Sequence, residues 1–512
     1  MAASSTRSST GDARWSGLAG ATTLVLGLTV VVGVVLRFVA DSPLWLDEAQ
    51  SVALADRAPG GLVDALRHDG HPPLFYLLLA AWTAVVGESA FAVRVLSGLL
   101  GLVALGLVVV VVRRHADARV AGLALGVLAA SPFAIRYATE ARMYALLIVL
   151  LLLGHLAVEA AWRRPIRRNL FAVGLVVAAL LYTHYWALFL VAVLLGGLGL
   201  AMATGRLGVA PRLLAAVAAG AAAFLPWLPV FLDQLAHTGT PWSPGPRPTV
   251  VVALALESFG GGRGSEALLV AVVLSVLVVL GLGTRGDRAE LGLADLPWLW
   301  LAAGVGITTM ALGAGVSLVT QTAFQGRYAV FCFIPVVLAA AVGLARLPRQ
   351  AAALALLLLV GLSWISVARE LSRDRTQVGV AAEVVAERGA DGDLVVFCPD
   401  QLAPAGHRLL ADRFRTVAYP ALDDGRSVDW YDYADRNRSA DPAAAADEIV
   451  ARAGTGYTWM VWIDGYRNYG RQCGRLHGEL AARLGGSHHL VAANGDDYYN
   501  AANLNAFGPV AP

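Results

Sequence analysis

The sequence predicts a polytopic α-helical membrane protein that ends in a separate α/β domain. Of its 512 residues, 57% are hydrophobic and only 15% are charged, and the mean hydropathy is +0.63. Soluble globular domains carry about 25% charged residues, so this composition excludes a wholly soluble protein. Apolar runs long enough to cross a bilayer recur within residues 17–371, and mixed polar sequence occupies residues 372–512.

Eleven apolar stretches are candidate membrane spans, because each comes close to the roughly 20 residues that cross a hydrocarbon core. The first is too long for a signal-peptide core and lacks a clear cleavage site, so we interpret it as an uncleaved span. The polar residues 1–16 before it are expected to be disordered and cytoplasmic. The stretches are 17–39, 90–112, 119–135, 142–161, 169–186, 187–204, 211–232, 266–284, 296–319, 328–345 and 351–368.

The apolar residues 73–87 are left out of this count because of how arginine is distributed among the connections between spans. If they do not cross and the N-terminus is inside, five connections that each contain at least two Arg face the cytoplasm, as the positive-inside rule requires. A crossing at 73–87 would place all of these connections outside. The sequence therefore predicts that 73–87 follows the outer interface and that 372–512 is extracytoplasmic. The connections are 113–119, 163–168, 204–212, 284–291 and 345–350.

Residues 372–512 are predicted to form an extracytoplasmic α/β domain, because they mix short apolar runs with helical periodicity. The turn-rich segment 494–507 is interpreted as a surface loop, with a carbohydrate-lining role as the alternative. The three cysteines lack zinc-site spacing, and Cys398 and Cys473 could form one disulfide if the domain is exported. Expected strands are 394–398 and 457–463, and expected helices are 403–412, 442–453 and 467–484.

Ionisable residues gather in the segment 44–82, directly after the first apolar run. Asp47 and Glu48 lie in a predicted short amphipathic helix, and His71 with the following two prolines opens a second, since Pro suits a first helical turn. Three interpretations of the acidic pair stay open: a solvated loop, a set of metal ligands, or a catalytic base with a helper. Neighbouring carboxylates suit a hard divalent cation, which keeps the metal alternative in place.

Two arginines begin predicted spans on the same outer face. Arg142 lies at the entry of one span and Arg327 at the entry of another. Such an arginine can snorkel to the interface or form a structural ion pair. It can also bind a phosphate through its planar fork of N–H donors, and two of them could clamp one lipid phosphate. The neighbouring substrate-contact candidates are Glu140 and Tyr144, Gln325 and Tyr328, and His184 with Tyr185. In the turn that contains His184, Tyr185 is alternatively an ordinary interfacial anchor.

These motifs together resemble the signatures of GT-C membrane glycosyltransferases, in particular the bacterial relatives of protein O-mannosyltransferases and of lipid A aminoarabinose transferase. The resemblance covers residues 17–368, and it depends on the order and common face of the motifs. They are the pair Asp47 and Glu48, HPPLFY at 71–76, EARMYAL at 140–146 and RYAVFCFIP at 327–335.

The resemblance implies a GT-C-like fold and an enzyme of the bacterial plasma membrane. It would move a sugar, mannose or arabinose in class, from a polyprenyl-phosphate donor to an extracytoplasmic glycan, lipid or protein, usually with inversion. Asp47 matches the catalytic base and Glu48 its acidic neighbour. Arg142 and Arg327 would hold the donor phosphate, with His71 where some relatives have Lys. Because arginine can neutralise the phosphate, no cofactor is required.

Two other classes of function stay open, a polytopic lipid or solute transporter and a non-catalytic cell-envelope assembly protein. A transporter would be expected to place ionisable groups near the bilayer midplane, often within internal repeats. Here these groups are predicted on one face, and the sequence has no visible repeat. The net charge of +2 gives no reason to expect nucleic acid as a partner.

Overall fold

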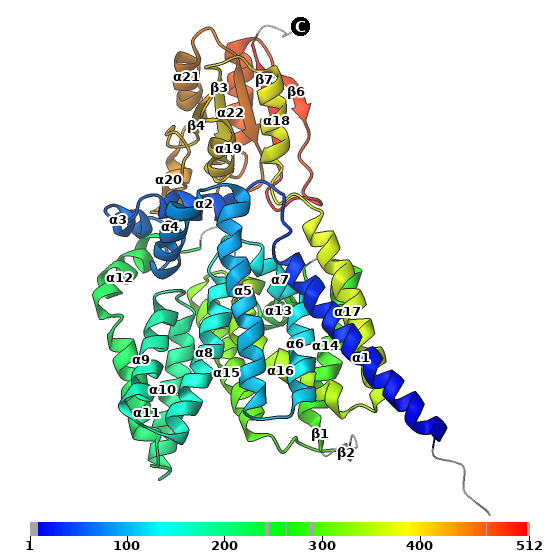
Figure 1. The fold of residues 1–512 in the computed structure, drawn as a ribbon. Helices are drawn as coiled ribbons and strands as arrows, with labels where there is room; N and C mark the ends of the chain where they lie inside the picture. Colours follow the sequence, from blue (N-terminus) through cyan, green and yellow to red (C-terminus); the bar gives the residue numbers. More distant parts are fainter. Residues whose placement is uncertain (1–8, 241–244, 263, 286–289, 467, 509–512) are drawn as a thin grey trace, which may run out of the picture.

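A bundle of long helices carries a smaller sheet-containing domain at one end (Figure 1). This computed structural model describes residues 9–240, 245–262, 264–285, 290–466 and 468–508. The helices of the bundle are α1 (Ser9–Leu36), α5 (Ala90–Arg113), α6 (Ala118–Ala130), α7 (Pro132–Ala138), α8 (Tyr144–Arg163), α9 (Arg167–Leu181), α10 (Ala187–Ala203), α11 (Ala210–Ala222), η1 (Leu225–Trp227), α12 (Leu228–His237), α13 (Pro248–Gly260), α14 (Ser265–Gly283), α15 (Pro297–Thr320), η2 (Gly326–Ala329), α16 (Val330–Arg346) and α17 (Arg349–Leu371).

Seven helices within the described residues are long and apolar enough to cross a membrane. The pair α6 and α7, bent by 58°, makes an eighth if it forms one broken span. The other predicted spans coincide with α1, whose apolar part is Thr23–Leu36, and with the shorter α9 and α10, and all three pack into the same bundle. Packed neighbours and local bilayer thinning accommodate such short helices. The prediction of a polytopic α-helical membrane protein is confirmed.

The first helix begins earlier than the sequence analysis expects. Residues 1–8 lie outside the described residues, but α1 starts at Ser9, so residues 9–16 are helical where disorder was predicted. The physical reason is cooperativity: once an apolar span has formed, each further residue adds one hydrogen bond without a new nucleation cost.

Close glycine contacts hold part of the bundle together. A Cβ atom on Gly281 of α14 would lie 2.0 Å from the Ala339 oxygen of α16, and one on Gly343 would lie 2.0 Å from the Leu277 oxygen. The two backbones therefore approach as closely as small residues allow, which is how helices associate where lipid removes the hydrophobic driving force.

Three short helices cover the end of the bundle beneath the sheet domain (Figure 1). They are α2 (Leu46–Ala55), α3 (Leu62–Arg67) and α4 (Leu74–Val86). Helix α4 has 13 residues, too few to cross a bilayer, and the Trp82 Nε1–H donates to the Ala92 oxygen of α5 at 2.8 Å. The two helices expected around Asp47 and after His71 are therefore present as α2 and α4.

The C-terminal domain is a five-stranded sheet with helices on both faces, as predicted. Its strand order is β4-β3-β5-β7-β6; β4, β3 and β5 are parallel, and β7 is antiparallel to both β5 and β6. The strands are β3 (Leu394–Cys398), β4 (Arg415–Ala418), β5 (Thr458–Trp462), β6 (His488–Val491) and β7 (Asn503–Phe507), and the helices are α18 (Val378–Arg388), η3 (Asp400–Leu402), α19 (Ala403–Leu410), α20 (Tyr433–Ser439), α21 (Pro442–Ala453) and α22 (Gln472–Leu484). A two-stranded ribbon of β1 (Thr284–Arg285) and β2 (Glu290–Leu291) belongs to the bundle.

Alternation along β3 divides the core of this domain into two layers. Leu394 and Val396 pack with α21 and α22, whereas Val395 and Phe397 pack with α18 and α19. Each fully buried side chain of this size contributes about 1.5–3 kcal/mol. Cys398, at the end of β3, forms a disulfide with Cys473 of α22.

The segment 494–507 is not the plain surface loop that the sequence analysis favoured. Its second half forms β7, which lies between β5 and β6. Its first half reaches the cavity described below, because residues 495–500 line it. The turn-rich composition of this segment did not indicate β7, because this strand is buried by its neighbours in the sheet and not by an apolar composition of its own.

Backbone and side-chain hydrogen bonds dock the C-terminal domain on the short helices. Gln50 of α2 donates to the Val428 oxygen at 3.0 Å and accepts from the Val428 N–H at 2.8 Å. The Trp430 N–H donates to the His68 oxygen at 2.8 Å. In the linker after α17, Arg375 donates to the Thr139 oxygen at 2.7 Å and to its hydroxyl at 2.9 Å. The domain is therefore held against the part of the bundle that carries Asp47.

Candidate active site

A cavity of about 1040 Å³ lies between the helical bundle and the C-terminal domain. Helix α2, the turns before α8, α10 and α16, the linker after α17 and residues 495–500 all contribute to its wall. Eight of the site residues predicted from sequence line it: Asp47, His71, Arg142, His184, Tyr185, Gln325, Arg327 and Tyr328.

Asp47 is held between two arginines from distant parts of the chain. Arg327 Nη1 lies 2.5 Å from Asp47 Oδ2, and Arg142 Nε lies 3.9 Å from the same oxygen. Burial raises the pKa of the Asp47 carboxyl, but the charges of Arg327 and Arg142 lower it by a larger amount. The net pKa of Asp47 therefore lies below its ordinary value. Asp47 is therefore ionised at neutral pH and can accept a proton.

Arg142 is fixed by hydrogen bonds along its guanidinium. Its Nη1 donates to Ser51 Oγ at 3.1 Å and to the Asp47 backbone oxygen at 3.4 Å, while its Nη2 lies 3.2 Å from His71 Nε2. The residue lies in the short turn between α7 and α8, so its long side chain reaches α2 without belonging to a span. This arrangement leaves the planar fork pre-organised at the cavity wall.

Asp69 and His71 form a dyad behind Arg142. Asp69 Oδ2 lies 2.7 Å from His71 Nδ1 and also accepts from the Tyr76 hydroxyl at 3.1 Å. The Nδ1 atom of His71 thus faces this carboxylate, and its Nε2 atom faces Arg142. Burial raises the pKa of Asp69, but His71, Arg142 and Gln50 together lower it by more, and the net pKa is below the ordinary value. Sequence reasoning missed Asp69, although its position two residues before His71 was a usable signal.

His184 presents a donor to the cavity. The Trp186 N–H donates to His184 Nδ1 at 3.1 Å, so the neutral ring carries its proton on Nε2. Nε2 is buried and has no hydrogen-bond partner among the described residues. Burial, followed by the positive fields of His71, Arg142 and Arg327, lowers the pKa of His184 well below its usual value. The group is therefore an uncharged N–H donor that a ligand oxygen could satisfy.

Glu48 points away from the cavity. Its two oxygens accept from Arg94 Nε at 2.8 Å and Arg94 Nη2 at 2.6 Å, Oε1 also accepts from the Ala141 N–H at 3.0 Å, and Arg375 lies 3.5 Å away. The side chain is fully buried and does not line the cavity. The predicted acidic neighbour of the base thus holds α2, α5 and the linker together. Asp47 and Glu48 therefore pair with different arginines.

Two more of the predicted contacts lie behind the cavity wall. Glu140 is buried, and its oxygens have no hydrogen-bond partner among the described residues; the nearest charge is Arg136 Nε at 3.9 Å. Burial raises the pKa of Glu140 despite the opposing charges of Arg136 and Arg375. Tyr144 packs on His184, with 5.9 Å between the ring centroids. Neither Glu140 nor Tyr144 lines the cavity.

The structure predicts that Glu48→Gln damages folding more than chemistry. The change leaves the buried charges of Arg94 and Arg375 without a full counter-charge, which costs about 3–5 kcal/mol. We expect a clearly lower apparent melting temperature for the purified protein in detergent. The control is Glu266→Gln, whose partner Arg369 is 44% exposed and whose ion pair should contribute little. A Glu48→Gln protein that melts like the wild type would contradict this structural role.

Comparisons with known proteins agree with this architecture. A family model described as dolichyl-phosphate-mannose-protein mannosyltransferase matches residues 70–230. The apo crystal structure of ArnT from Cupriavidus metallidurans is similar with a TM-score of 0.64 and 15% identity, over 96% of this chain and 100% of that one. ArnT from the same organism bound to undecaprenyl phosphate gives 0.58 and 14%, over 96% and 99%.

Comparison with curated protein sequences found no match. The similarity to ArnT extends over the bundle and the C-terminal domain together, since it covers nearly the whole of both chains. The chain therefore shares the fold of ArnT, and its residues 70–230 match the mannosyltransferase family model.

Proposed function

We propose that the chain is an integral-membrane glycosyltransferase that moves a sugar of the mannose or arabinose class from a polyprenyl-phosphate donor to an extracytoplasmic acceptor, with inversion. The observation that carries this proposal is one carboxylate, Asp47, held between Arg142 and Arg327 in a single cavity. The family description names a dolichyl-phosphate sugar, and ArnT binds undecaprenyl phosphate, which supports this class of donor.

The two arginines suit the donor phosphate. A phosphodiester carries one negative charge in the donor and gains a second as the sugar leaves, so fixed positive groups stabilise the transition state more than the ground state. Arg142 and Arg327 both line the cavity, and both are already desolvated there. In a site of low dielectric, each arginine stabilises a negative charge more strongly than it would in water.

Asp47 takes the role of the base. The acceptor oxygen attacks the anomeric carbon while the bond from that carbon to the phosphate oxygen breaks. The electron pair leaves with the polyprenyl phosphate, and the acceptor proton passes to Asp47. A base on the face opposite the leaving phosphate gives inversion. No metal ion and no nucleotide takes part in this scheme.

Donor binding would also tune the base. Without a ligand, Arg327 and Arg142 hold the pKa of Asp47 low, which makes it a weak proton acceptor. A phosphate that enters between the arginines shares their charge and so raises the pKa of Asp47 toward the range where a base works well. The site would thus become reactive when the donor is present.

The remaining cavity residues position the reactants. The dyad of Asp69 and His71 holds Arg142 in place, which makes both of them positioning residues. The unsatisfied Nε2–H of His184 would donate to an oxygen of the sugar or the phosphate. The Tyr185 hydroxyl already donates a hydrogen bond to Gln234 and accepts one from Trp227, so Tyr185 shapes the wall around His184.

The proposed orientation places the cavity and residues 372–512 outside the plasma membrane of a bacterial cell. The Arg-rich connections between the spans support it through the positive-inside rule. The disulfide between Cys398 and Cys473 supports it independently, since such bonds persist in oxidising compartments. The acceptor would then reach the cavity from the side of the C-terminal domain, which contributes Trp430 and Tyr466 to its wall.

The first test of the function is Asp47→Asn. The change is nearly isosteric and removes the proton acceptor, so transfer from a polyprenyl-phosphate sugar should fall at least about a hundredfold while the protein still binds the donor. The control is Asp64→Asn on α3, an 89% exposed carboxylate away from the cavity. Near-normal transfer by Asp47→Asn in membranes would remove the main support for the assignment.

The second test is Arg142→Lys, which keeps the charge and loses the fork. Lysine cannot reproduce the two-pronged contact that the guanidinium fork would make with the donor phosphate, and a lost hydrogen bond to a charged group costs about 1.5–3 kcal/mol. The KM for the donor should therefore rise about tenfold or more, with little change in melting temperature. A variant that melts much earlier yet keeps its KM would mean that Arg142 serves the fold alone.

The third test concerns orientation. In a Cys332→Ala background, Ser439→Cys, exposed at the end of α20, should react with an impermeant maleimide on intact spheroplasts. Arg168→Cys, exposed in the first turn of α9, should react only after lysis. Labelling in the reverse order would refute the proposed topology.

A further inference from the structure

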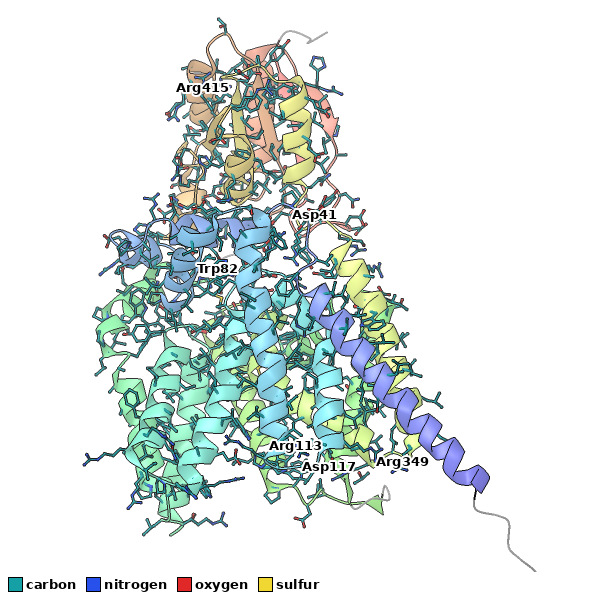
Figure 2. All side chains as sticks on the ribbon, in the orientation of Figure 1. Asp41, Trp82, Arg113, Asp117, Arg349 and Arg415 are labelled. Carbon is teal, nitrogen blue, oxygen red and sulfur yellow. A yellow bond between two sulfur atoms is a disulfide. The ribbon has the colours of Figure 1, made fainter. Side chains whose placement is uncertain are left out.

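A second group of ionisable side chains lies at the far end of the bundle. His115 follows α5, and its neighbours Arg113 and Asp117 are at the end away from the C-terminal domain (Figure 2). His155 and Glu159 lie one turn apart on α8 and so share a helix face. The proposed sugar transfer at the opposite end makes no use of this group.

The donor atoms of the three side chains converge. His115 Nε2 lies 3.0 Å from His155 Nε2 and 3.7 Å from Glu159 Oε1, and all three ligand atoms lie within 4.8 Å of one another. Two imidazole nitrogens bound to one tetrahedral zinc ion at about 2.0–2.1 Å would be about 3.3 Å apart. The spacing therefore fits ligands around one small cation.

The surrounding helices hold the rings in this arrangement. Trp298 of α15 stacks on His115, with 4.8 Å between centroids and 10° between planes. The two histidine rings meet almost at right angles, at 81°. His115, His155 and Glu159 therefore join the ends of α5, α8 and α15, three helices that are far apart in the sequence.

Two arginines share the carboxylate. Arg114 and Arg163 lie 3.3 and 2.5 Å from Glu159 oxygens, and their side chains are 39% and 59% exposed, whereas Glu159 is only 10% exposed. Both arginines can turn into solvent when a cation takes their place, because long exposed side chains are held weakly. The nearly buried Glu159 cannot leave in the same way.

We propose that His115, His155 and Glu159 bind one divalent transition-metal ion, zinc in type, that clamps this end of the bundle. Imidazole nitrogen with a single carboxylate selects zinc and its first-row neighbours over magnesium or calcium. Three protein ligands leave the fourth position for water or another small ligand. The site is independent of the sugar-transfer cavity and of the function proposed for it.

The test is metal binding by the full-length protein, purified in detergent without a histidine tag and stripped with a chelator. Titration with Zn²⁺ against a chromogenic chelator should show one tight site per chain. His115→Ala and His155→Ala should each weaken it at least tenfold, and Glu159→Gln should weaken it in the same direction. His488→Ala, an exposed histidine on β6, should leave binding unchanged.

A second readout covers variants that fold poorly. Zn²⁺ should raise the melting temperature of the wild type by mass action and should not raise that of Glu159→Gln to the same extent. Bound Co²⁺ should give the intense visible absorption of a tetrahedral site in the wild type.

Failure of the wild type to bind Zn²⁺ or Co²⁺ at micromolar concentration would overturn the proposal, because the cluster would then be a hydrogen-bonded ion-pair contact between helices. Binding that survives His115→Ala but is lost in His71→Asn would place the ion in the cavity and would overturn it equally. The assays use no sugar donor, so they are independent of the proposed transfer.

Discussion

The buried ion pair between Glu48 and Arg94 is the interaction on which the site depends. Both side chains are almost fully desolvated, and a charge in that position is stable only when its partner is present and its remaining hydrogen-bonding groups are satisfied. Arg375 from the linker and the Ala141 N–H complete the set. One carboxylate thereby ties α2 to α5, to the turn before α8 and to the entrance of the C-terminal domain.

This anchor determines where Asp47 can go. Consecutive residues of a helix diverge by about 100°, so once Glu48 faces the protein interior, Asp47 must face elsewhere. It faces the cavity, where Arg142 and Arg327 lie. The two adjacent acids therefore have separate tasks, one structural and one at the site, and this division follows from helix geometry together with the position of Arg94.

Much of the fold and part of the site could be predicted from the sequence. Long apolar runs indicate the spans because a helix in lipid needs an apolar surface. Arg142 and Arg327 were predicted as site residues because each lies at the entrance of a predicted span. The separate roles of Asp47 and Glu48 could not be assigned, because the positions of Arg94 and Arg375 relative to α2 depend on tertiary packing. The dyad of Asp69 with His71 was missed for a similar reason, since its importance depends on Arg142, a residue on another element. The strand β7 was missed because its neighbours in the sheet, and not its own composition, bury it.

The C-terminal domain completes the cavity as well as covering it. Hydrogen bonds from Val428 and Trp430 fix it to α2 and α3, and residues 495–500 bring a second set of polar groups over Asp47. Tyr499 packs under Arg136 at 4.8 Å, and its hydroxyl donates to Glu370 of α17. Under the proposed function, an acceptor would meet the surface that residues 495–500 and the linker before α18 present to the cavity, so variation there would change the acceptor while leaving Asp47 and its arginines untouched.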